Sequence, residues 1–102
     1  MVVRTKQDAA RVLSEIEGDK RFYSNDGCII SDLQQLAECL AHMNDDSFGY
    51  HVTPEKNDFS RWIGDVLGDE KLARDISVVV NRLEAAAMVK TRVTWLKAKM
   101  QK

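Results

Sequence analysis

The chain has 102 residues, of which 44% are hydrophobic and 30% are charged, and its formal net charge is -1. This length predicts one domain with a modest core rather than two domains. A charge so close to zero excludes a general electrostatic attraction to nucleic acid or to anionic membranes. No apolar run is long enough to span a bilayer and no apolar block opens the chain, so a cytoplasmic location is expected.

The cysteine, histidine and aspartate residues do not form a recognisable metal motif. Two cysteines in a cytoplasmic protein are expected to be reduced, buried thiols, although a disulfide between them stays open. No zinc spacing occurs, and residues 44–47 lack the glycine and glutamate of a calcium loop. We therefore expect neither a metal nor a cofactor. The side chains considered as ligands are Cys28, Cys39, His42, His51, Asp45 and Asp58.

The first half of the chain predicts two helices separated by a hairpin. Residues 5–17 carry apolar side chains at helical spacing, and Thr5 can cap the helix. Residues 21–30 predict a β-hairpin around the turn sequence Asn-Asp-Gly. Residues 31–43 predict a second helix, with Ser31 as its cap.

The next segment predicts a loop, a strand and a helix. The loop is expected at residues 44–47, and a short strand at residues 48–52 would add to the hairpin. The helix begins at residues 53–55, where a threonine precedes a proline, or is capped later, at Asn57 or Asp58.

The last segment predicts one long helix. Gly68 ends the preceding helix, and from Asp69 onward no proline or glycine interrupts the apolar pattern. A helix of about 30 residues would be roughly 45 Å long, so residues 74–102 project from the domain or fold back. The expected architecture is a single α+β domain over residues 1–102, mostly helical, with about four helices and a hairpin or three-stranded sheet.

The middle of the chain carries a set of apolar, aromatic and polar residues. They are Phe22, Gly27, Ile30, Ser31, Leu33, Leu36, Leu40, Met43, Asp46, Phe48, His51, Val52, Asn57, Asp58, Phe59, Trp62, Ile63, Val66, Asp69, Leu72 and Ala73. In these residues the chain resembles a small domain of unknown function found in archaeal and bacterial proteins. The resemblance covers residues 22–73, about half of the chain. It implies a folded module without an established activity.

Polar side chains around the expected strand–helix junction form a candidate functional cluster. An Asp58 carboxylate beside His51 could orient the imidazole for base catalysis, as in a small-ligand or hydrolytic site. In the alternative, Asn57 or Asp58 caps the helix and His51 braces the junction. The structural interpretation is favoured because no nucleophile or second base accompanies the pair, and no catalytic residue is assigned. The cluster consists of His51, Asn57, Asp58, Arg61 and Trp62.

The C-terminal segment offers a candidate interaction face. Its apolar residues continue at three- and four-residue steps and would meet water if the last helix projects. Such a face needs a protein partner, either a second copy of the chain or another protein. The face consists of Val89, Val93, Leu96 and Met100.

The same segment carries basic side chains and no acidic ones. They could form a handle for nucleic acid, with an aromatic ring stacking on a base. Alternatively, the cations favour the negative end of a helix dipole. The second interpretation is favoured, because a few lysines on a nearly neutral protein bind nucleic acid weakly. The basic patch consists of Lys90, Arg92, Trp95, Lys97 and Lys99.

The sequence therefore predicts a non-enzymatic protein-interaction or regulatory module that associates through its C-terminal helix. Three alternatives stay open. The first is weak nucleic-acid binding through the basic end, and the second is a small-ligand or hydrolytic site at His51 and Asp58. The third is association of an amphipathic C-terminal helix with a membrane surface.

Overall fold

The computed structural model describes residues 2–101 and has a mainly helical α+β fold, as expected. The described residues form six α-helices where about four were expected. In chain order the elements are α1 (Lys6–Leu13), the 3₁₀ turn η1 (Gly18–Lys20), β1 (Phe22–Tyr23), β2 (Ile29–Ile30), α2 (Leu33–His42), α3 (Asp45–His51), β3 (Val52–Thr53), β4 (Lys56–Asn57), α4 (Asp58–Trp62), the π-helical turn η2 (Ile63–Leu67), α5 (Glu70–Ile76) and α6 (Arg82–Met100).

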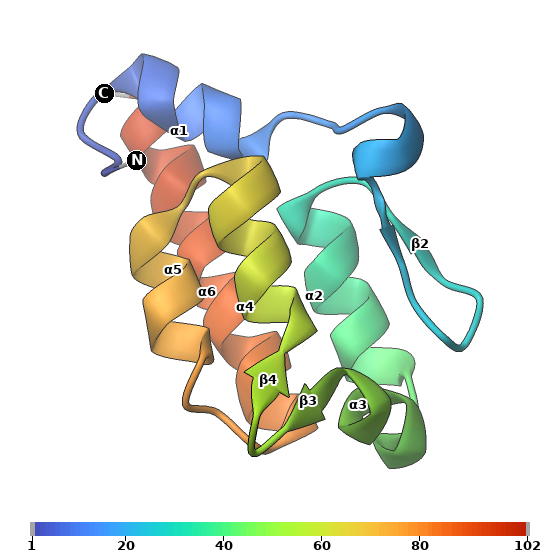
Figure 1. Cartoon of the computed structure of the whole chain (residues 1–102). Coiled ribbons are helices and arrows are strands. Elements are labelled where there is room, and N and C mark those ends of the chain that lie inside the picture. The colour runs from blue at the N-terminus through green and yellow to red at the C-terminus, as the bar shows by residue number, and fades with distance from the viewer. Residues whose placement is uncertain (1, 102) are drawn as a thin grey trace.

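Helix α6 is the longest helix, and α1, α2 and α5 pack against it (Figure 1). It makes its most extensive contact with α2 and the next with α1. In the view of Figure 1, α4 and α5 lie in front of α6, and the two small strand pairs lie at the periphery. The body measures 40 × 27 × 22 Å. The 19 residues of α6 span about 28 Å, so this helix fits within the body instead of projecting.

Local capping explains where several helices begin. Thr5 caps α1 as expected: its hydroxyl accepts from the Asp8 N–H at 3.1 Å, and the Asp8 carboxylate accepts from the Thr5 N–H at 3.2 Å. For α4 the later of the predicted starts is confirmed, because the Asn57 Oδ1 accepts an N–H three residues on at 3.0 Å. Helix α2 is capped by Asp32, one residue after the expected Ser31.

The predicted loop at residues 44–47 and strand at residues 48–52 are wrong, because Asp45–His51 form α3 and only Val52 of the predicted strand is in a strand, β3. Asn44 caps α3, and two aspartates follow in its first turn, where the positive end of the helix dipole favours them. Phe48 and His51 lie one turn apart and are both buried. Burial of this helical face outweighs the β-propensity of the aromatic and branched residues.

The two strand pairs are separate antiparallel sheets, so the predicted three-stranded alternative does not form. In the hairpin, Phe22 pairs with Ile30. In the second pair, Val52 lies opposite Asn57. The proposed helix start at residues 53–55 is therefore wrong, since these residues end β3 and turn the chain into β4.

The predicted continuous helix from Asp69 is also wrong, because residues 77–81 separate α5 from α6. Three consecutive valines lie in this connection, and only Val79 is buried. β-branched residues lower helix propensity, and Asn81 caps a new helix by accepting the Glu84 N–H at 2.9 Å. The turn brings α5 and α6 side by side, as Figure 1 shows.

A buried ion pair joins α5 to α6. The Asp69 carboxylate caps α5 by accepting the Leu72 N–H at 3.1 Å. It also accepts two hydrogen bonds from the Arg92 guanidinium, at 2.7 Å from Nε and 3.0 Å from Nη2. The two side chains are 1% and 11% exposed. A bidentate pair of this kind is strong, and neither charge tolerates the loss of its partner.

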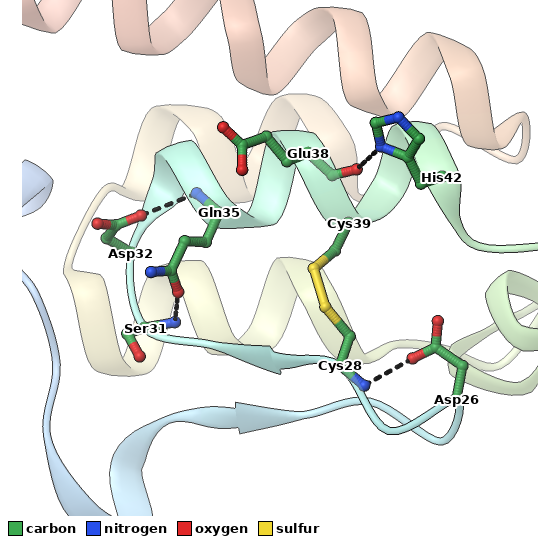
Figure 2. The surroundings of a disulfide bond; sticks show 8 residues. All are labelled: Asp26, Cys28, Ser31, Asp32, Gln35, Glu38, Cys39 and His42. Carbon is green, nitrogen blue, oxygen red and sulfur yellow. Dashed lines mark hydrogen bonds between the residues drawn. A yellow bond between two sulfur atoms is a disulfide. The ribbon is translucent and has the colours of Figure 1, made fainter.

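A disulfide joins Cys28, just before β2, to Cys39 in α2 (Figure 2). The expectation of two reduced thiols is therefore wrong. Hydrogen bonds order the chain beside the crosslink: the Asp26 Oδ1 accepts from the Cys28 N–H at 3.0 Å, and the Gln35 Oε1 accepts from the Ser31 N–H at 2.8 Å. The crosslink and the second of these bonds both tie the hairpin side of the chain to α2.

Arg92→Ala should lower the free energy of unfolding by about 3–5 kcal/mol, because it leaves the Asp69 carboxylate buried without its partner. Lys71→Ala is the matched control, since it removes an exposed pair in which Lys71 Nζ lies 2.6 Å from Asp75. That variant should lose less than about 1 kcal/mol. Urea unfolding followed by circular dichroism measures both losses, and equal losses would contradict the assignment.

Reduction should destabilise the chain by up to about 3 kcal/mol, because the disulfide closes a loop with a sequence separation of 11 residues. Unfolding of the wild type with and without dithiothreitol measures this effect. The double variant Cys28→Ala, Cys39→Ala should unfold identically under both conditions. If the wild type has the same unfolding midpoint with and without dithiothreitol, the crosslink does not stabilise the fold.

Candidate functional site

The predicted meeting of His51 and Asp58 is present, at the junction of α3 and α4. His51 Nδ1 lies 2.9 Å from the Asp58 Oδ2, and the backbone N–H of Asn25 donates to His51 Nε2 at 3.0 Å. Nε2 is therefore an acceptor and Nδ1 a donor, which describes a neutral imidazole. The side chain ties the hairpin turn to the start of α4.

This corner is filled rather than hollow. His51 is 5% exposed. Its ring lies 5.0 Å from Phe22 and 5.2 Å from Phe59 between ring centroids, both edge to face. A small pocket of about 300 Å³ brings together three members of the predicted cluster, Asp58, Arg61 and Trp62, but His51 does not line it. Because the Nε2 lone pair already accepts the Asn25 N–H, no free base faces a substrate, and the geometry favours a structural role.

Two of the other three members of the predicted cluster donate hydrogen bonds to backbone carbonyls of other parts of the chain. Asn57 caps α4 and donates from Nδ2 to the Ile76 carbonyl at 3.1 Å. Trp62 is buried and donates from Nε1 to the Lys20 carbonyl at 2.8 Å. Arg61 is exposed. Asn57 and Trp62 therefore anchor α4 to its surroundings and do not complete a reactive site with His51.

The Asp58 carboxyl has a pKa below its ordinary value. Its partial burial acts in the opposite direction, but the hydrogen bonds from His51 and from Lys56 Nζ, at 2.9 and 3.0 Å, outweigh it. The positive charge of Lys56 adds to the lowering. The folded chain thus binds a proton at Asp58 less readily than the unfolded chain does.

The predicted interaction face on the last helix is wrong for most of its residues. Val89, Val93 and Leu96 are 0%, 4% and 0% exposed, because this side of α6 packs into the core of its own chain. Met100, 41% exposed, is the one member of the four that solvent reaches. A partner that contacts α6 must therefore meet a different side of this helix.

The predicted basic patch is divided between two edges of α6. Successive residues in a helix are rotated by about 100°, so Lys90 and Lys97 share one edge, while Arg92, Trp95 and Lys99 share the other. Lys97 reaches toward α2, where its Nζ lies 3.4 Å from the Gln34 Oε1. The Arg92 charge is neutralised by its buried acidic partner. This distribution does not favour a track for nucleic acid.

The edge of α6 that carries Trp95 lines a groove. The groove has a volume of about 910 Å³ and lies between α5, α6 and the N-terminal segment. Its charged lining residues are Lys71, Arg74, Asp75, Glu84 and Arg92. Its apolar lining residues are Val2, Val3, Leu72, Ala87, Met88 and Trp95.

Trp95 is the most distinctive side chain of this groove. It is 44% exposed. The Arg92 guanidinium carbon lies 4.4 Å from its ring centroid, and the Lys99 Nζ lies 5.5 Å from the same centroid. Cations over an indole ring restrict its orientation, and half-exposed tryptophans are typical of binding surfaces.

The sequence could have indicated part of this groove. Arg92 and Lys99 stand three residues before and four residues after Trp95, a spacing that places all three side chains together on a helix. The opposite wall could not be foreseen, because the turn at residues 77–81 is what brings Leu72 of α5 beside α6.

Across residues 2–101, no three histidine, cysteine or acidic side chains gather as a metal site would require. Within the same range, no helix has the length and apolarity needed to cross a bilayer. Comparisons with protein-family models, with curated proteins and with solved structures find no significant match. The resemblance over residues 22–73 therefore stays a prediction.

Asp58→Asn should destabilise the fold by about 1–2 kcal/mol at pH 7, where the charged carboxylate holds two partners. This contribution is present above the ordinary aspartate pKa of about 3.9 and is lost as the pH falls through the lower pKa of the folded state. The difference between wild type and variant in urea unfolding should therefore shrink between pH 5 and pH 3. A difference that is independent of pH would refute this assignment.

Proposed function

We propose that the chain is a non-enzymatic protein-interaction module and that the groove between α5 and α6 receives its partner. The observation that carries this proposal is an open, largely apolar groove whose wall contains a half-exposed tryptophan. Among its described lining residues there is neither a histidine nor a cysteine, and Thr91 supplies the only hydroxyl. These side chains suit binding better than catalysis.

The composition of the groove supports a protein partner. Tryptophan, methionine and arginine are enriched at the centres of protein interfaces, where apolar floors are bordered by polar rims. Here Met88 and Trp95 provide the apolar contact, and charged residues of both signs border it. Two helical walls also form the kind of groove in which an amphipathic segment can lie.

Selection from a phage-displayed random-peptide library on the immobilised chain tests this proposal. Ala87→Glu places a carboxylate in the groove at an exposed helix position. We expect enriched peptides to bind this variant at least about tenfold more weakly than the wild type, because the added charge loses water without gaining a partner.

Ala98→Glu is the matched control, since it makes the same change at an exposed position of the same helix outside the groove. It should bind the enriched peptides as the wild type does. Peptides that bind Ala87→Glu and the wild type equally, or a selection that enriches no sequence family, would refute the proposal.

A further inference from the structure

We infer that the occupant of the groove is a second copy of the chain, with the two α6 helices antiparallel about a two-fold axis. This inference rests on the proposed function, because it assigns the partner of the same groove. It is carried by the order of side chains along the groove-facing edge of α6, which is complementary to itself when the helix is reversed.

The complementarity centres on a point between Thr91 and Arg92. Met88 and Trp95 lie at equal distances on either side of this point, and so do Glu84 and Lys99. All four share one side of the helix, since spacings of four and seven residues return a side chain to nearly the same edge. Reversing one helix against the other about this centre brings Met88 toward Trp95 of the other copy and Glu84 toward Lys99 of the other copy.

The charges at the two ends are available for such pairing. Glu84 is exposed and lines the groove. Lys99 lies over the Trp95 ring. Within the described residues neither side chain forms an ion pair of its own. A two-fold axis would make each Glu84–Lys99 contact twice, whereas parallel helices in the same register would place like charges together.

The apolar centre fits the same arrangement. Met88 is partly buried and Trp95 is 44% exposed, so each copy offers a flexible side chain and a broad ring. Methionine adapts to the shape of a neighbour and makes favourable contacts between its sulfur and an aromatic ring. A two-fold contact buries both Met88–Trp95 pairs together, which removes from water the ring that a single chain leaves half exposed.

Sedimentation velocity over a dilution series of the full chain tests the inference. The wild type should dimerise reversibly. Glu84→Lys and Lys99→Glu should each weaken dimerisation about tenfold, which corresponds to about 1.4 kcal/mol, because each reverses one charge in both contacts. The double variant and an equimolar mixture of the two single variants should both recover dimerisation, since opposite charges then face each other again.

Lys90→Glu is the control for charge alone, because Lys90 is exposed on the other edge of α6 and should leave dimerisation unchanged. Circular dichroism checks that each variant is folded. A wild type that remains monomeric at every concentration overturns the inference. It is also overturned if the wild type dimerises but the mixture of Glu84→Lys and Lys99→Glu does not recover dimerisation. If peptides are still captured through the groove in those cases, the interaction function stands and only self-association fails.

Discussion

The carboxylate of Asp69 is almost fully removed from solvent, and its burial is tolerable because Arg92 meets it with two parallel hydrogen bonds. The same carboxylate caps α5, so one charged group sets both where α5 begins and how α5 lies against α6. The guanidinium that it holds lies over the Trp95 ring. The shape of the groove wall therefore depends on an ion pair beneath it, and the tryptophan has a fixed support.

Features that depend on neighbours in the chain could be predicted from the sequence. Thr5 and Asn57 cap helices because their side chains reach N–H groups three residues away, whatever the rest of the fold does. The contact between His51 and Asp58 was predictable for a similar reason, since a short connection leaves the two side chains close. The prediction of its structural role agrees with a ring whose two nitrogens both have partners.

Features decided by burial could not be predicted in this way. Residues 48–52 have strand-forming composition, but burying Phe48 and His51 on one helical side determines α3. Without the turn at residues 77–81, the last helix has no neighbour to cover Val93 and Leu96. Those side chains then look like a surface for a partner, although the folded chain buries them in its own core. The Cys28–Cys39 crosslink likewise depends on how the hairpin lies against α2.

The hydrogen bond between the hairpin turn and His51 restricts its two ends very differently. At position 25 the donor belongs to the main chain, so any residue except proline can supply it. At position 51 the ring must accept at one nitrogen and donate from the other, a combination that the neutral imidazole provides in one rigid plane. Substitutions in the turn can therefore accumulate without breaking the link, while its other end admits almost no replacement. Among proteins of this fold, the hydrogen bond would therefore be visible in the sequences only as a constant histidine at position 51, while position 25 varies.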